Sequence, residues 1–315
     1  MGKYGRDQLI IASRGSRLAL AQTEEVAQRL RTLYPGLEVE VRIVKTRGDQ
    51  IRDVPLHKVG GKGLFTKALE EVLLAGGADL AVHSLKDLPT GLPKGLCLAA
   101  VPRRADPRDA LILADSLASR AGDFSLACLP PGARVGTSSL RRRAQLRHLR
   151  PDLQLEEVRG NVDTRLRKLD EGQYDALILA VAGLERLGWT QRLTWRLPFE
   201  VCTPAVGQGA LGLETRADDE EVWELLQPLE DAATRAAVRA ERTFLQTLGG
   251  GCRMPLGAVA QVERTALVLT AVVASKDGTR LLRRTAVGPW EEAELLGREM
   301  AEELKRSGGR WILGE

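Results

Sequence analysis

Cysteine is scarce in this chain, and its spacing excludes the structural roles that cysteines most often share. The 315 residues contain four cysteines, at positions 97, 128, 202 and 252, which lie far apart and form no C-x-x-C pair. Structural zinc sites and disulfide frameworks need several cysteines at short, regular spacings, so neither is predicted and no metal site is expected. At least one thiol is therefore expected to be free for chemistry.

Long apolar runs are also missing. Hydrophobic residues make up 43% of the chain and charged residues 28%, as in ordinary globular proteins, so no membrane partner is expected. The polar start, residues 1–7, runs into an apolar stretch that is too short for the core of a secretory signal. We therefore expect a cytoplasmic protein.

Aromatic residues are few, at 4% of the chain, and no stacking platform is interleaved with the basic residues. The formal charge of +4 is a mild excess, which fits anionic ligands but is weak support for nucleic acid. No nucleic-acid partner is expected, and the positions of the arginines matter more than their number.

The N-terminal part alternates between strand and helix patterns. Apolar spacing predicts a strand at 9–13, a helix over 17–33, a strand at 37–44, a helix over 62–75 and a strand at 78–82. A second run has a strand at 110–113, a helix over 138–149, a strand at 153–158, a helix over 162–169 and a strand at 176–181. We expect two doubly wound α/β halves around a cleft, with residues 210–214 returning as a strand to the first half.

The pattern changes after residue 230. It predicts a helix over 230–248, strands at 256–262 and 267–274, a third strand to 287 and a helix over 291–306, with a hairpin turn at Asp277-Gly278. The expected fold is thus a periplasmic-binding-protein-like pair of α/β halves plus a small α+β domain. The predicted domains are 1–102 with 205–228, 103–204, and 229–315, the last of which carries Cys252.

Cys252 lies in the loop Gly249-Gly250-Gly251-Cys252-Arg253, which follows a predicted helix. A single cysteine is usually a small buried hydrophobe, and that interpretation stays open. The glycines favour an exposed loop, and the charge of Arg253 favours the thiolate, so the sequence indicates a reactive or modified cysteine.

A carboxylate follows a buried strand in the segment His83-Ser84-Leu85-Lys86-Asp87. Asp87 is a candidate for acid–base work or for stabilising a cation, because a partly desolvated carboxylate acts more strongly than one in water. The alternative is a turn with an ordinary helix cap. For His83 we favour a packed or hydrogen-bonded residue over a base.

Arginines follow several predicted strands. The segment Gly136-Thr137-Ser138-Ser139-Leu140-Arg141-Arg142 places hydroxyl groups and guanidinium groups at a helix start, where cations oppose the helix dipole. Arginines recur in Arg14-Gly15-Ser16 and in Arg159-Gly160-Asn161-Val162-Asp163-Thr164-Arg165. This pattern predicts a site for a ligand with several carboxylates, with a solvated basic face as the alternative.

Two glycine-rich segments remain. Gly60-Gly61-Lys62-Gly63-Leu64-Phe65 lacks the full spacing of a phosphate-binding loop, so a nucleotide site is rejected and a mobile loop is expected. Val206-Gly207-Gln208-Gly209-Ala210 is a tight turn at a strand entry.

Taken together, these segments closely resemble the porphobilinogen deaminase family, from about Ile10 to the C-terminus. The segments that carry the resemblance are 12–16 with 18–20, 45–49, the loop at Lys62, 83–87, 136–142, 159–165, 204–210 and 250–252. The resemblance implies a transferase that joins four porphobilinogen molecules head to tail with loss of ammonia on a covalent dipyrromethane primer. Hydrolysis then releases hydroxymethylbilane, a tetrapyrrole.

The same resemblance implies a role for individual residues. Cys252 would carry the cofactor through a thioether, and Asp87 would be the catalytic carboxylate that contacts pyrrole N–H groups and stabilises the cationic azafulvene. The cofactor would be held by Cys252, Lys86, Asp87, Thr137, Ser139, Arg141 and Arg142. Substrate would be bound by Arg14, Ser16, Arg159, Arg165 and Gln208, and the active-site loop would contain Lys62 and Phe65. A monomer is expected.

Two other functions stay open from the residues alone. Two α/β halves across a cleft are also the design of solute-binding proteins, which need no cysteine. A nucleic-acid-binding protein would show a steep salt dependence of its affinity for DNA or RNA.

Overall fold

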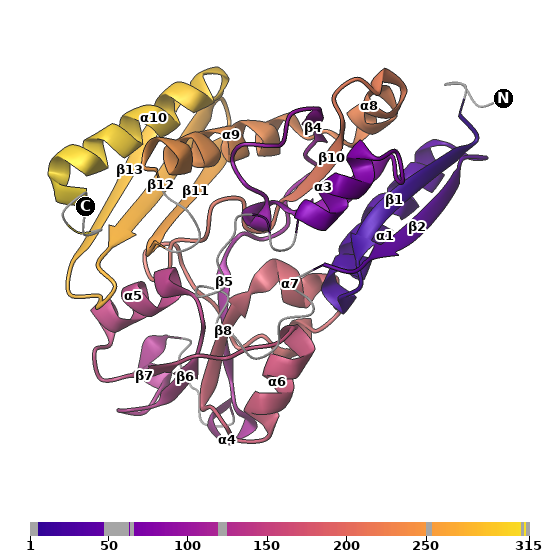
Figure 1. Cartoon of the computed structure of the whole chain (residues 1–315). Coiled ribbons are helices and arrows are strands. Elements are labelled where there is room, and N and C mark those ends of the chain that lie inside the picture. The colour runs from indigo at the N-terminus through magenta and orange to yellow at the C-terminus, as the bar shows by residue number, and fades with distance from the viewer. Residues whose placement is uncertain are drawn as a thin grey trace. The chain divides into compact units, whose positions relative to one another are not determined.

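The computed structural model describes residues 6–46, 63, 66–118, 125–249, 254–309 and 312 (Figure 1). The chain divides into two compact units, Met1–Ala105 with Ala210–Arg235, and Asp106–Gly209 with Ala236–Glu315. It leaves the first unit, forms the central part of the second, returns to the first and ends in the second. Each unit is described by itself. In the described part of the chain, no helix has both the length and the apolar character needed to cross a membrane.

The first unit is built on a five-stranded sheet with the order β2-β1-β3-β10-β4. Its strands are β1 (Gln8–Arg14), β2 (Glu38–Val44), β3 (Leu80–Ser84), β4 (Leu96–Ala100) and β10 (Leu211–Arg216). β2, β1 and β3 run parallel, and β10 runs antiparallel to both of its neighbours. The helices of this unit are α1 (Arg17–Leu33), α3 (Lys67–Leu74), the 3-10 helix η1 (Leu85–Asp87), α8 (Glu220–Leu226) and the 3-10 helix η4 (Gln227–Leu229).

Helix α1 shows why these residues fold as they do. Ser16 caps its start, since the side-chain oxygen accepts a hydrogen bond from the backbone N–H of Ala19 at 3.3 Å. Val26 and Leu30, spaced four residues apart, are buried against the sheet in one apolar cluster with Leu9 of β1. The cap and the apolar stripe together fix both where the helix begins and which face it buries.

The second unit repeats this arrangement in a sheet with the order β7-β6-β8-β5-β9. Its strands are β5 (Asp109–Leu113), β6 (Arg134–Gly136), β7 (Gln154–Glu156), β8 (Ala176–Ala180) and β9 (Trp195–Arg196). β7, β6 and β8 are parallel, and β5 is antiparallel to β8. The helices are α4 (Asp115–Ala118), α5 (Leu140–Leu149), α6 (Val162–Asp170) and α7 (Val181–Arg186), with 3-10 helices η2 (Leu126–Cys128) and η3 (Thr190–Arg192).

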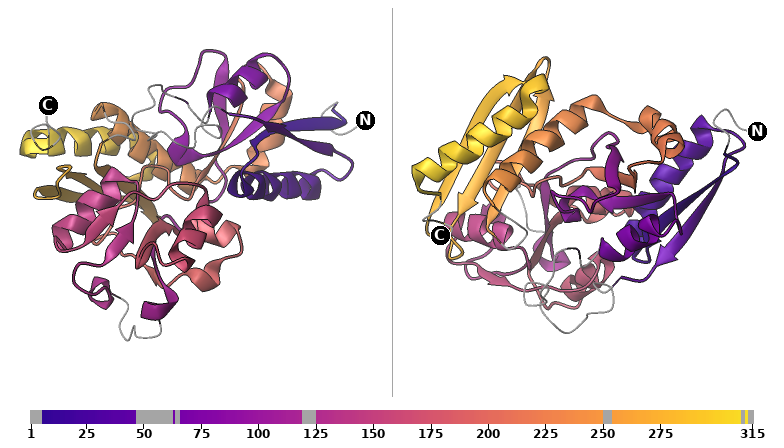
Figure 2. Two further views of the ribbon diagram at one scale, coloured as in Figure 1. Left: turned by 60° about the horizontal axis from the view of Figure 1, so that its bottom comes forward. Right: turned by 45° about the horizontal axis from the view of Figure 1, so that its top comes forward.

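The C-terminal region adds an antiparallel sheet with the order β11-β12-β13. Its elements are β11 (Leu256–Glu263), β12 (Ala266–Ala274), β13 (Leu281–Pro289), α9 (Ala232–Thr247), the 3-10 helix η5 (Trp290–Glu292), α10 (Ala293–Leu304) and η6 (Lys305–Gly309). α9 and α10 cover one face of the sheet (Figure 2), where Phe244, Leu269 and Met300 are buried in a common core. The turn at Gly278 packs against α5, because the Gly278 carbonyl lies 3.0 Å from Nδ1 of His148.

The predicted fold class, two α/β halves and a small α+β domain, is confirmed by these three sheets. The return of residues 210–214 to the first sheet is also confirmed, since β10 pairs with β3 and β4. The predicted helix over 138–149 begins later, at Leu140, because Ser139 is its cap. Three strands, β4, β6 and β9, were not predicted from the sequence. The proposed boundaries of three domains stay a prediction.

Candidate active site

In the first unit, four of the predicted site residues gather at one edge of the sheet. β1 and β3 are neighbouring parallel strands, so their C-terminal ends lie at the same edge. Arg14 ends β1 and Ser16 caps α1, while Lys86 and Asp87 lie in η1, directly after β3. Strand ends of this kind are where α/β sheets place their ligand-binding groups.

Asp87 is exposed, whereas the sequence analysis expected a partly desolvated carboxylate. The physical reason is its place in a short 3-10 turn beyond the end of β3, where the neighbouring Leu85 takes the buried position. The Asp87 side chain is therefore open to solvent.

Behind this edge the first unit holds a buried group of titratable side chains. Nε2 of His83 lies 2.8 Å from Oε2 of Glu214, and both residues are buried on adjacent strands. His83 is thus a packed, hydrogen-bonded residue, as the sequence analysis favoured. Glu70 of α3 is buried near this pair, and its burial raises the pKa of the Glu70 carboxyl. The contact between His83 and Glu214 joins β3, the strand that leads to Asp87, to its neighbour β10.

In the second unit, hydroxyl groups and arginines meet where β6 passes into α5. Ser139 caps α5, since its Oγ accepts from the backbone N–H of Arg142 at 3.4 Å. The hydroxyl of buried Thr137 accepts from the backbone N–H of Ser139 at 3.3 Å. Arg141 and Arg142 follow in the first turn of α5, so the predicted cofactor-binding groups of this unit lie together.

Both arginines are buried, and both contact one carboxylate that the sequence analysis did not consider. Nη1 of Arg141 lies 2.6 Å from Oδ2 of Asp109, and Nη2 of Arg142 lies 2.6 Å from Oδ1. Burial alone would raise the pKa of Asp109, but the charges of Arg141 and Arg142 outweigh burial and lower that pKa well below its usual range. The cations at this helix start are therefore offset in part by Asp109 and are not explained by a ligand alone.

Two further side chains complete the group around Asp109. Nε2 of Gln208 donates to Oδ1 of Asp109 at 2.9 Å and to the carbonyl of Pro107 at 2.8 Å. The Cys202 thiol donates to Oδ2 of Asp109 at 3.2 Å. Burial and the negative charge of Asp109 raise the pKa of Cys202 to about 12. Gln208, predicted to bind substrate, thus belongs to the same buried cluster as Arg141 and Arg142.

We predict that Cys202 resists alkylation in the folded protein. A thiol with a pKa of about 12 has about a thousandfold less thiolate at neutral pH than an ordinary cysteine, in addition to being buried. Iodoacetamide labelling followed by peptide mass spectrometry should modify the partly exposed Cys128 well before Cys202. Equal labelling rates for the two residues in the native protein would contradict the buried cluster.

The remaining predicted arginines follow β7, which is the parallel neighbour of β6. Nη2 of Arg159 pairs with Oε2 of Glu157 at 2.9 Å, and Nε of Arg165 donates to the carbonyl of Gly160 at 2.8 Å. Gly160 has a φ of +104°, and a Cβ there would clash with Thr164, so only glycine suits this turn. The end of β7 therefore lies at the same edge as Thr137 and brings these arginines to it.

Three predicted site residues, Cys252, Lys62 and Phe65, lie outside the described residues. Two further residues of the second unit contact segments that carry predicted site residues and were not named from the sequence. Asp109 begins an apolar strand, and nothing in its local sequence links it to the helix start that carries Arg141 and Arg142. Arg186 ends α7 six residues after β8, and its Nη2 donates to the carbonyl of Gly209 at 3.1 Å. The sequence pattern of arginines directly after predicted strands does not include Arg186, because a helix separates it from β8.

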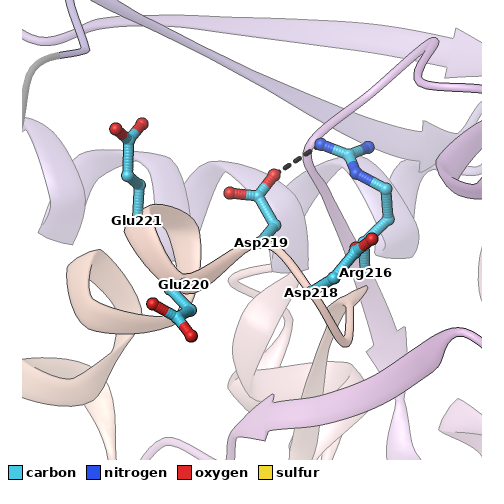
Figure 3. A pocket seen from close by; sticks show the side chains of 5 residues that line it. All are labelled: Arg216, Asp218, Asp219, Glu220 and Glu221. Carbon is cyan, nitrogen blue, oxygen red and sulfur yellow. Dashed lines mark hydrogen bonds and ion pairs between the residues drawn. The ribbon is translucent and has the colours of Figure 1, made fainter.

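A surface hollow of about 400 Å³ lies elsewhere, at the start of α8 (Figure 3). It is lined by Arg216, Asp218, Asp219, Glu220 and Glu221. The one arginine is paired with Asp219 at 2.5 Å, so the hollow is acidic and unsuited to an anionic ligand. It contains none of the predicted site residues.

Comparison with known proteins shows the family to which the chain belongs. The family model described as porphobilinogen deaminase, dipyromethane cofactor binding domain, matches residues 9–224, and that of the porphobilinogen deaminase C-terminal domain matches residues 235–306. The porphobilinogen deaminase of Desulforudis audaxviator is 54% identical over 308 residues, which cover 98% of this chain and 97% of that protein. That of Syntrophobacter fumaroxidans is 52% identical over 305 residues, covering 97% of this chain and 96% of the relative. The chain belongs to the porphobilinogen deaminase family.

Proposed function

We propose that this protein joins porphobilinogen molecules head to tail with loss of ammonia and releases hydroxymethylbilane by hydrolysis after four additions. Family membership over nearly the full chain supports this activity. The structural observation that carries the proposal is the buried pair Arg141 and Arg142, which shares the single carboxylate of Asp109. Two guanidinium groups against one carboxylate leave a buried excess of positive charge, which favours an anionic ligand.

The donor set at the start of α5 suits a dipyrromethane cofactor, because each pyrrole carries an acetate and a propionate. Nε and Nη2 of Arg141 donate to no residue within the described ranges, whereas all three nitrogens of Arg142 already donate to Asp109 or to the carbonyl of Ile178. Arg141 is therefore the better supported carboxylate ligand of the two. Thr137, Ser139 and Lys86 would supply further donors, and Cys252 would form the thioether. When bound, the cofactor supplies the anchored end to which each new pyrrole is joined.

Other residues of the chain would stabilise the developing charge and bind the incoming substrate. Asp87, exposed beyond β3, would accept hydrogen bonds from pyrrole N–H groups and stabilise the positive charge that develops as ammonia leaves. Arg14, Ser16, Arg159 and Arg165, all near strand ends, would bind the acetate and propionate groups of incoming substrate. Gln208 would act within the cluster around Asp109, since its amide nitrogen donates to that carboxylate.

Ammonia release tests the proposed activity against a binding function. Incubation of the purified chain with porphobilinogen should release one ammonia for each porphobilinogen consumed and yield a tetrapyrrole by mass spectrometry. A heat-denatured sample is the control and should release no ammonia. Tight binding of porphobilinogen without ammonia release would identify a binding protein and overturn the proposal. We further propose that the protein is a monomer and that it acts in the cytoplasm. Light scattering of the protein as it elutes from a size-exclusion column measures its molar mass and so tests whether it is a monomer.

A further inference from the structure

The topology of the second sheet explains how one acidic residue comes to meet two arginines. β5 runs antiparallel to β8, and Asp109, the first residue of β5, pairs with Ala180, the last residue of β8. The start of β5 therefore lies at the edge where the parallel strands end. Arg141 and Arg142 enter from the helix that follows β6 at the same edge. An acidic residue at this one position can reach both guanidinium groups.

The carboxylate of Asp109 is fully buried and accepts hydrogen bonds on both oxygens. Oδ1 accepts from Nε of Arg142 at 3.0 Å, from its Nη2 at 2.6 Å and from Nε2 of Gln208 at 2.9 Å. Oδ2 accepts from Nη1 of Arg141 at 2.6 Å and from Sγ of Cys202 at 3.2 Å. With this many donors the carboxylate has little freedom to rotate, so it holds each guanidinium group in one orientation.

We infer that Asp109 is a positioning residue for carboxylate binding: it holds the Arg141 guanidinium by Nη1, so that Nε and Nη2 are left for an acetate or propionate group of the pyrrole ligand. This inference rests on the proposed function. Nη1 of Arg141 is additionally held by the carbonyl of Thr203 at 2.7 Å, so the orientation is fixed from two directions. A preorganised guanidinium binds a carboxylate without first losing side-chain freedom.

Asp109→Asn tests the inference, because it keeps the shape of the side chain and removes its charge. Asp106→Asn is the matched control: Asp106 pairs with Arg108 at 2.6 Å in the same segment but contacts neither Arg141 nor Arg142. Each protein is produced in cells that make no porphobilinogen, mixed with increasing porphobilinogen, and weighed by intact-protein mass spectrometry to follow covalent cofactor attachment. We expect half-complete attachment to need at least about tenfold more porphobilinogen in Asp109→Asn, and no more than about twofold more in Asp106→Asn.

A double-mutant cycle with Arg141→Gln separates positioning from general support of the fold. If Asp109 acts through Arg141, adding Asp109→Asn to Arg141→Gln leaves the porphobilinogen requirement within about twofold of Arg141→Gln alone. The double variant also removes one buried cation along with its partner, so it keeps the test available if Asp109→Asn alone does not fold. Additive effects in the cycle, or normal attachment in Asp109→Asn, would overturn the inference. Absence of attachment in the parent protein would instead overturn the proposed function, and this inference with it.

Discussion

A Cys252→Ser variant is expected to fold, to carry no covalently bound pyrroles and to lose turnover by at least about a thousandfold, which corresponds to about 4 kcal/mol of activation free energy. The reason is chemical. A thiolate is a far stronger nucleophile than a serine hydroxyl at neutral pH, so the serine variant cannot form the proposed anchor. The measurements are the mass of the intact purified chain and the rate of ammonia release from porphobilinogen.

Cys128→Ser is the control for this variant, because Cys128 is a partly exposed thiol in η2, a segment that contains none of the proposed site residues. It should keep both the adduct and the parent rate. Parent-like product formation by Cys252→Ser would refute the anchoring role, whatever the mass of that chain. Loss of folding in Cys252→Ser, seen by circular dichroism, would instead show that the cysteine supports the fold.

An Asp87→Asn variant should keep the attached cofactor but lose about 10²- to 10⁴-fold in turnover rate. The amide has nearly the same shape as the carboxylate and can still accept a hydrogen bond from a pyrrole N–H group. It carries no negative charge, so it cannot stabilise the cation left when ammonia departs. Because Asp87 is exposed and outside the core, the melting temperature should stay close to that of the parent.

Asp218→Asn is the control for Asp87→Asn, because it removes the negative charge of another exposed carboxylate in the same unit. It should leave turnover unchanged. Intact mass and single-turnover rates distinguish failed cofactor attachment from slow chemistry. Asp87 would have no part in the mechanism if Asp87→Asn carried the cofactor and turned over at close to the parent rate.

Local patterns in the sequence were enough to predict the elements that have a clear capping residue and a regular spacing of apolar residues. Helix α1 was predicted from Arg17 to Leu33, as observed, because Ser16 caps it and its apolar residues repeat at helical spacing. β6, Arg134–Gly136, was missed because three residues are too few to show an alternating pattern. The architecture of two doubly wound halves led to the prediction that residues 210–214 return as a strand to the first half, and β10 does pair with β3 and β4.

Charges that meet across the fold were much harder to predict. The arginines at the start of α5 were correctly singled out, but their partner Asp109 lies 32 residues earlier in the chain. No local pattern links the two segments, and only the antiparallel placement of β5 brings them together. The exposure of Asp87 was also hard to predict. Because Asp87 follows a buried strand, it was expected to be partly desolvated, but the chain turns outward after that strand.

The order of strands in the first sheet has a consequence for biosynthesis. β10 lies between β3 and β4, yet it is synthesised only after the whole first segment of the second unit. Until residues 211–216 emerge, β3 and β4 each keep a row of open backbone donors and acceptors. A nascent chain that stalls before this point therefore exposes unpaired strand edges, which favour association with other chains.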